Sequence, residues 1–161
     1  MAIKRLVLDD FFDDEEFTLI GIHSSLEDFR LAYLINKHLQ IHLSRKPIDM
    51  KSDNLAAHYS IFEWVDEAQL TVWNLVSNSC KVELVQQPEM ADSLFGASKT
   101  TKTYFLLPEF KRVNYVLKIE TELSEQTQKL ILNTIQDIKQ VVMAHSIDAD
   151  LLKSKENLIF N

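Results

Sequence analysis

The sequence contains very little glycine, proline and cysteine. Its 161 residues include two glycines, three prolines and one cysteine, Cys80. Two glycines cannot make the glycine-rich loops that bring backbone amides close to a nucleotide phosphate, so phosphate-loop and dinucleotide-binding patterns are excluded. One cysteine can form neither an intrachain disulfide nor a thiolate cluster for zinc or iron–sulfur. This cysteine usage indicates a reducing compartment, and we predict a cytoplasmic protein.

Long apolar runs and an excess of positive charge are also missing. The longest unbroken apolar run extends only from Leu31 to Ile35, whereas a membrane-spanning helix needs about 20 such residues. The formal charge is −7, from 24 acidic and 17 basic side chains. The negatively charged phosphate backbone of a nucleic acid repels a protein with this net negative charge. The sequence therefore predicts that neither a membrane nor nucleic acid is a partner.

What remains is ordinary globular composition, with 46% hydrophobic and 25% charged residues. The length suits one domain with a real core. We predict a single domain over residues 1–161. It would include an acidic N-terminal segment at 1–16, an irregular loop at 87–102 and a C-terminal tail at 149–161.

The first predicted unit is a strand followed by a helix. Residues 17–22 are apolar at nearly every position, which indicates a strand buried on both faces and therefore central. Ser24 with Glu27 three residues later is typical of a capping box. The helix that it would open is expected to end near Leu39.

The middle and last thirds are predicted to form most of the sheet. Residues 58–65, 70–76 and 82–85 predict a meander of three antiparallel strands. Further strands are expected at 104–107, 115–119 and 142–147, with a helix capped by Ser124 between the last two. A strand–helix–strand unit of this spacing makes its two strands parallel. The predicted fold class is α+β, a mainly antiparallel sheet of about six to seven strands with two helices on one face.

Several residues that can carry chemistry have simpler structural explanations. His38 and His42 have the spacing of metal ligands on one helix face, but that helix should end between them and no acidic residue separates them. The acidic residues between Asp9 and Glu16 lack the glycine turn of a calcium loop. Cys80 lies beside Lys81, yet a lone cysteine near a strand edge is more often inert. We predict no metal site, no cofactor and no catalytic residue.

His23 is a better candidate, because residues between a strand and its helix often contribute to binding sites. A histidine that only hydrogen-bonds nearby backbone explains the same position. Trp64 and Trp73 are also candidates, although aromatic pairs across strands more often belong to a core.

The segment Leu107–Tyr115 is the most distinctive local motif. Pro108 ends a strand and suits the first position of a helical turn, where Glu109 would face exposed amides. Asn114 can hydrogen-bond the backbone as extended chain resumes. Structural roles therefore explain the segment. A binding role for Glu109, Lys111 and Arg112 is a second interpretation.

This segment resembles the signature of the IPExxxVDY family of small bacterial proteins, which are found mainly in Bacteroidetes. The motif positions here are Leu107, Pro108, Glu109, Val113, Asn114 and Tyr115. Residues 17–31 also resemble the opening strand and helix of that family, and the similarity extends to Ile147. Asn114 replaces an aspartate of the motif and cannot act as a carboxylate base or ligand. The resemblance implies no activity and assigns no catalytic residue.

Two functions from different classes fit these observations. We favour a non-catalytic cytoplasmic module that forms a homodimer or docks another protein, to which the apolar ends of the tail 149–161 would contribute. The tail packing on its own domain is an equal alternative. The rival is a small-molecule site or small enzyme beneath the loop Pro88–Lys102. Its expected lining residues are His23, Tyr59, Trp64, Trp73 and Glu109.

Overall fold

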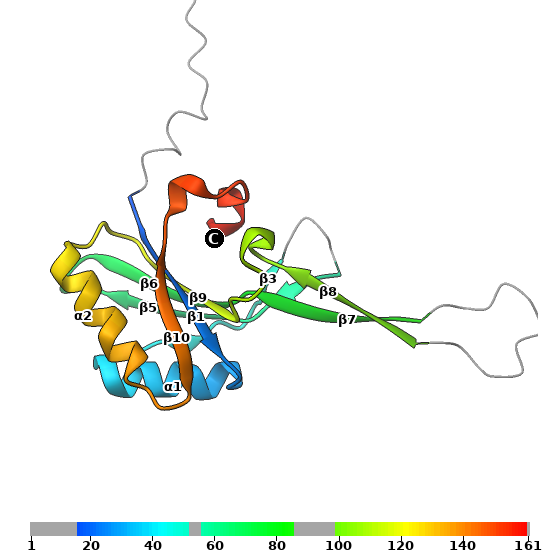
Figure 1. Cartoon of the computed structure of the whole chain (residues 1–161), viewed down its shortest axis with the longest axis horizontal. Coiled ribbons are helices and arrows are strands. Elements are labelled where there is room, and N and C mark those ends of the chain that lie inside the picture. Colours follow the sequence, from blue (N-terminus) through cyan, green and yellow to red (C-terminus); the bar gives the residue numbers. More distant parts are fainter. Residues whose placement is uncertain (1–15, 52–55, 86–98, 161) are drawn as a thin grey trace, which may run out of the picture.

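The computed structural model describes residues 16–51, 56–85 and 99–160, and its main feature is a six-stranded antiparallel sheet (Figure 1). The strand order is β10-β1-β9-β6-β5-β2. These strands are β1 Thr18–Ser24, β2 Ser44–Arg45, β5 Ile61–Asp66, β6 Thr71–Ser77, β9 Tyr115–Ile119 and β10 Val141–Ile147. The predicted α+β class with a mainly antiparallel sheet is confirmed.

Both helices pack on one face of this sheet. They are α1, Asp28–Leu39, and α2, Glu125–Gln136, and each directs an apolar stripe inward. Ile35 and Ile135 are fully buried against Ile20, Ile22 and Leu117 of the strands. Figure 1 shows the two helices on the side of the sheet away from the C-terminal tail. The predicted arrangement of the helices is therefore confirmed.

The opposite face is covered by two segments without long helices. One follows the strand β8 (Lys99–Phe105) and contains the 3-10 helix η2, Pro108–Phe110. The other is the C-terminal tail, with η3 (Ala149–Leu151) and η4 (Lys155–Leu158). Leu152 and Leu158 of the tail are buried on this face together with Leu19 and Val116. Of the two alternatives for the tail, packing on its own domain is the one observed.

Coverage on both faces explains why β1 carries apolar side chains on both of its sides. Leu19 points to the tail side, whereas Ile20 and Ile22 point to the helices. β1 pairs with β9 on one edge and β10 on the other, so it is a central strand as predicted. β9 and β10 run parallel, as the strand–helix–strand spacing predicts. They are not neighbours, because β1 lies between them.

The predicted cap of α1 is wrong. Glu27 occupies the N-cap without a side-chain hydrogen bond, three residues after Ser24. The Ser24 hydroxyl instead accepts from the amide of Leu26 and donates to the carbonyl of Gln140. Ser24 is still part of β1, so its side chain joins the strand to the segment before β10. For α2 the prediction is confirmed, since the Ser124 hydroxyl accepts from the Thr127 amide.

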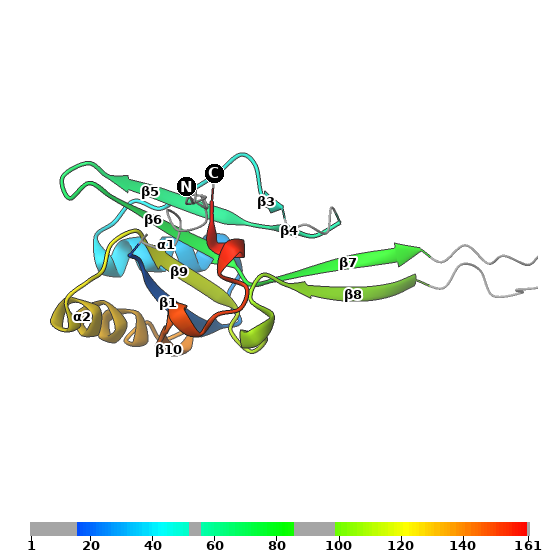
Figure 2. The same cartoon turned by 90° about the horizontal axis from the view of Figure 1, so that it is seen from above.

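The predicted meander is wrong in its third strand. β5 and β6 form a hairpin, with Trp64 opposite Trp73. β9 then pairs with the free edge of β6, so the next strand, β7 (Ser79–Val85), has no place in the sheet. It pairs instead with β8, and the two extend away from the body as a ribbon (Figures 1 and 2). The first strand is also divided, because β4 (His58–Tyr59) pairs with β3 (Met50–Lys51) in a sheet of its own.

The predicted irregular loop 87–102 must be shortened. Residues 99–102 belong to β8. The remainder lies outside the described residues, as does the acidic N-terminal segment except for Glu16.

Across the described ranges, neither helix combines the length and apolar character needed to cross a membrane. The cytoplasmic location stays a prediction.

Candidate functional site

The motif Leu107–Tyr115 folds around a buried side chain that precedes it by about thirty residues. Asn78 is fully buried between β6 and β7. Its amide nitrogen donates to the carbonyls of Phe110 and Val113, both at 2.9 Å. Its amide oxygen accepts from the Leu107 amide at 2.8 Å. A single asparagine therefore satisfies three backbone groups of the motif, which fixes its path across the sheet.

The last two motif residues connect the segment to β1 and α1. The Asn114 side-chain oxygen accepts from the Ser24 amide at 2.9 Å, and the Asn114 amide donates to the Ile22 carbonyl. An aspartate could accept the first bond equally well, so the amide does not weaken this contact. The Tyr115 hydroxyl donates to the Leu26 carbonyl at 2.6 Å. Both side chains thus hold the turn from strand to helix.

The charged residues of the motif lie on its exposed side. Glu109 accepts a hydrogen bond from the Ser154 hydroxyl at 2.6 Å, which ties η2 to the C-terminal tail. The Lys111 ammonium lies 5.8 Å from the ring centre of Phe105. Glu109 and Lys111 therefore have partners within the fold, consistent with a structural role.

A hollow of ≈ 410 Å³ lies beside the motif and brings together four of the six predicted binding residues. These four are His23, Glu109, Lys111 and Arg112. Met143 and His145 of the edge strand β10 also line the hollow. The hollow is therefore built from β1, β10 and the motif segment, three parts of the chain that are distant in sequence.

His23 and His145 face one another in this hollow. Their Nε2 atoms are 3.0 Å apart, and the rings come from adjacent strands. His145 lies opposite Gly21 in the strand pairing, and a Cβ atom at Gly21 would be 3.1 Å from both Cε1 and Nε2 of that ring. A larger residue would therefore push the ring out of place. One of the two glycines in the sequence makes room for this pair.

The environment disfavours a positive charge on His23. Partial burial lowers the pKa of the His23 imidazole, the nearby His145 lowers it further, and a hydrogen bond with the Arg112 backbone acts in the opposite direction. The second nitrogen of His145, Nδ1, lies 3.3 Å from the Ser146 carbonyl. The lowered pKa favours a neutral His23, whose unprotonated ring nitrogen is able to bind a metal ion or accept a proton.

The two tryptophans lie elsewhere. Trp64 and Trp73 pack at the helix-side core with their ring centres 5.9 Å apart, whereas Tyr59 is buried on the opposite face. The five side chains expected beneath the loop Pro88–Lys102 are therefore divided between the two faces of the sheet. No described pocket collects them.

The weaker sequence candidates have ordinary surroundings. His38 and His42 are both exposed, and His42 contacts the edge of Trp64 with ring centres 6.1 Å apart. Cys80 is half-buried, and its Sγ accepts from the His58 amide at 3.4 Å. Within the described residues, no group of three or more His, Cys, Asp and Glu side chains has the geometry of a metal site.

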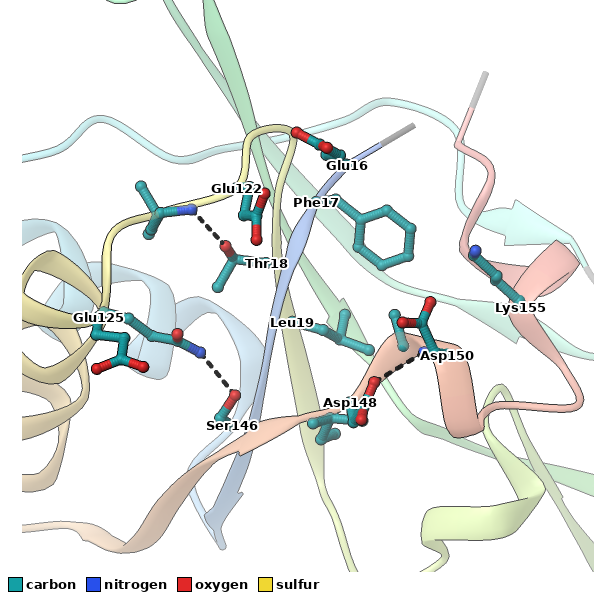
Figure 3. A pocket seen from close by; sticks show the side chains of 14 residues that line it. Glu16, Phe17, Thr18, Leu19, Glu122, Glu125, Ser146, Asp148, Asp150 and Lys155 are labelled. Carbon is teal, nitrogen blue, oxygen red and sulfur yellow. Dashed lines mark hydrogen bonds between the residues drawn. The ribbon is translucent and has the colours of Figure 1, made fainter. Parts of the chain in front are cut away.

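A second and larger hollow, ≈ 760 Å³, is rich in carboxylates. It lies where β1 begins, β10 ends and α2 starts, and Figure 3 shows its side chains. Its acidic residues are Glu16, Glu122, Glu125, Asp148 and Asp150. Lys155 is the one basic side chain among the described residues that line it. The hollow therefore presents an acidic surface.

The β7–β8 ribbon, which we call the arm, contrasts with this surface. Its root is packed against the core through Cys80 and Tyr104. Beyond the root, its described strands carry three lysines and one glutamate, namely Lys81, Lys99, Lys102 and Glu83. Leu84 and Val85 remain 41% and 60% exposed. The arm thus combines positive charge with apolar surface that its own body does not cover.

Sequence reasoning missed His145, Met143 and Asn78. His145 and Met143 alternate on one strand, but nothing in the sequence indicates that β10 would pair with β1. Asn78, followed by Ser79, has the local sequence of a tight turn. A buried asparagine is distinguishable from a turn asparagine only after its three backbone partners are placed.

Comparisons with known proteins found no match: neither a family model, nor a curated protein, nor a solved structure is similar to this chain. The resemblance to the IPExxxVDY family therefore stays a prediction.

Proposed function

We propose that the chain is a non-catalytic module that associates with a second copy of itself through the β7–β8 arm. The observation that carries the proposal is the position of the arm, which leaves the core at Cys80 and Tyr104 and extends beyond it (Figure 2). An isolated two-stranded ribbon is only marginally stable in water. Contact with another protein surface would stabilise it.

The side chains of the arm supply a face for such a contact. In the strand pairing Val82 lies opposite Lys102, and Leu84 lies opposite Thr100. Because side chains alternate along a strand, Val82 and Leu84 share the face on which Cys80 meets the core. An apolar strip therefore continues outward from the core along one side of the arm. Its far end has no described partner in the same chain.

Charge favours a second copy as the partner. The chain carries a formal charge of −7, so two copies repel one another except where opposite charges meet. The described strands of the arm carry more lysine than glutamate, and the hollow in Figure 3 is rich in carboxylates. The arm leaves the molecule on the side away from α2, which borders this hollow (Figure 1). We expect the arm of one copy to lie against the acidic hollow of the other.

The root of the arm allows it to be removed cleanly. The amide of Leu106 donates to the carbonyl of Asn78 at 2.8 Å, so the two ends of the arm meet. Replacing residues 82–102 by Asn-Gly would join Lys81 to its cross-strand partner Thr103 through a two-residue turn. Cys80 and Tyr104 stay in the core.

The test is the molar mass of the wild-type and arm-deleted chains, measured by light scattering over a range of concentrations. We expect the wild type to form dimers and the deleted chain to remain monomeric with an unchanged circular dichroism spectrum. A monomeric wild type at the highest concentration, or equal association of the two chains, would contradict the proposal.

A charge exchange tests where the arm binds. Lys99→Glu with Lys102→Glu should weaken association, and adding Glu122→Lys with Asp150→Lys should restore part of it. The matched control is Lys37→Glu with Lys139→Glu, which makes the same change of net charge at exposed positions on the rest of the surface. If the control weakens association equally, net charge rather than the acidic hollow is responsible.

A further inference from the structure

The His23–His145 pair has a geometry that the interaction module does not require. Neither ring belongs to the arm or the acidic hollow, and both are half-buried beside the motif. Two imidazoles whose Nε2 atoms are 3.0 Å apart can share one proton. The same two atoms are also close to the spacing of two ligands on one metal ion. Metal–nitrogen bonds of 2.0–2.1 Å at a tetrahedral angle separate the nitrogens by about 3.3 Å. The two nitrogens would have to part by about 0.3 Å. The rings, whose centres are 5.2 Å apart, now meet nearly head-on, so each would also have to turn until its Nε2 lone pair points at the ion.

The other nitrogen of the His145 ring lies near a backbone carbonyl, as in many metal-bound histidines. His145 Nδ1 is 3.3 Å from the Ser146 carbonyl. A backbone carbonyl at one ring nitrogen fixes the tautomer and directs the other nitrogen to the metal. Gly21 contributes by leaving room for the His145 ring against the strand. The orientation of the His145 ring is therefore set by the fold.

A third ligand is available on the same face. Met143 is opposite His23 in the strand pairing and two residues before His145, so it shares their side of β10. It also lines the hollow in front of the pair. In the described part of the chain no third His, Cys, Asp or Glu joins the two histidines in a ligand group. Two imidazoles and one thioether are a soft ligand set, which suits Cu(I) better than Zn²⁺ or Mg²⁺.

We propose that His23 and His145 bind Cu(I) through their Nε2 atoms, with the Met143 thioether as third ligand. The hollow of ≈ 410 Å³ leaves the ion accessible from solvent. Binding replaces the hydrogen bond between the two rings. The ring whose Nε2 carried the proton of that bond takes the tautomer protonated at Nδ1, so both neutral imidazoles offer an unprotonated Nε2 to the ion. No oxidation or reduction of the ion is involved.

The test is a competition titration of the full chain against a chromophoric Cu(I) chelator under reducing conditions. A Cys80→Ser background removes the one thiol, which would bind copper by itself. We expect one equivalent of Cu(I) to bind. His23→Gln and His145→Gln should each weaken binding at least ~100-fold, because loss of even an outer-shell partner costs ~10–100-fold. Met143→Leu should weaken binding about 10-fold, at the lower end of that range.

Matched controls are His38→Gln, His42→Gln and Met50→Leu, which remove the same side chains elsewhere and should leave the affinity unchanged. In ¹⁵N spectra, Cu(I) should move the Nε2 resonances of His23 and His145 more than their Nδ1 resonances. Absence of Cu(I) binding, or binding that survives His23→Gln and His145→Gln, would show that the pair is only a hydrogen bond. Loss of binding in the controls would overturn the assignment in the same way. A Met143→Leu affinity equal to wild type would overturn the three-ligand site.

Discussion

At the scale of single residues, this fold depends on polar side chains that satisfy backbone groups in regions without regular structure. Asn78 holds three backbone groups of the motif, Asn114 holds the end of β1, and Tyr115 holds the start of α1. Each replaces a bond that a helix or strand would otherwise provide. These backbone hydrogen bonds give the motif a structural role.

The buried Tyr115 hydroxyl should make the stability of the fold depend on pH in the alkaline range. Burial, with smaller effects from the carboxylates of Asp28 and Glu27, raises the pKa of its hydroxyl to about 12. Unfolded tyrosine loses its proton near pH 10. Between about pH 10 and 12 the unfolded chain therefore releases a proton that the folded chain retains. Stability contributed by the neutral hydroxyl is complete below pH 10 and falls as the pH rises through this window.

We expect Tyr115→Phe to lower the free energy of unfolding by about 1 kcal/mol at pH 8, because one hydrogen bond is lost. Its stability should also fall less steeply than that of the wild type between pH 10 and 12. Urea unfolding at several pH values measures both effects. Tyr33→Phe, at an exposed position on α1, is the control and should behave as the wild type. Equal alkaline slopes for Tyr115→Phe and wild type would refute the assignment.

At the scale of elements, the C-terminal tail is a structural cover for the second face of the sheet. It buries Leu152 and Leu158, and the Leu158 carbonyl accepts a hydrogen bond from the buried Lys118 ammonium at 2.8 Å. The rings of Phe17 and Phe160 lie 5.1 and 5.2 Å from the same ammonium. A strand that is apolar on both faces needs this cover.

Ending the chain at Asp150 should therefore lower the free energy of unfolding by about 3–6 kcal/mol, the burial of two leucines. It also removes the Leu158 carbonyl, one of the partners of the Lys118 ammonium, which lies 3.8 Å from the Glu120 carboxylate as well. The change in the free energy of unfolding caused by Lys118→Met should consequently be more favourable in the truncated chain than in the full chain. Urea unfolding of all four chains measures this coupling. A truncation that costs less than about 1 kcal/mol would show that the tail is not part of the core.

At the scale of the whole molecule, other parts of the chain cover both faces of the sheet, whereas apolar side chains of the arm remain exposed. The helices cover one face and the tail the other. At the edge strand β10, the Gln136 side chain accepts from the Ala144 amide and donates to the Val142 carbonyl, which hinders the addition of another strand. Self-association is therefore expected through the arm rather than through extension of the sheet.

Association of this kind couples stability to protein concentration. If only the folded chain dimerises, the wild-type melting temperature rises with concentration, whereas that of the arm-deleted chain stays constant. Differential scanning calorimetry over a hundredfold range of concentration measures the difference. The arm-deleted chain should match the wild type at the lowest concentration, because the described residues that it lacks, 82–85 and 99–102, lie outside both cores. A wild-type melting temperature independent of concentration would contradict this expectation.

Local patterns in the sequence determined the α+β class, the two helices and the central position of β1. These features follow from hydrophobic periodicity, which is visible in short stretches of neighbouring residues. The capping box at Ser24 failed because its hydroxyl found a partner at Gln140, more than a hundred residues away. The third strand of the meander failed because β9 took the place beside β6.

Only the tertiary structure decided the sites. Sequence spacing drew attention to His38 and His42, whereas folding brought together His23 and His145, which are separated by 122 residues. The pairing of β1 with β10 depends on which edges remain free after all other strands and helices have packed. That is a property of the complete set of contacts, so no local pattern contains it. Composition alone showed that glycine was scarce, and only the fold showed that Gly21 is where a ring needs the space.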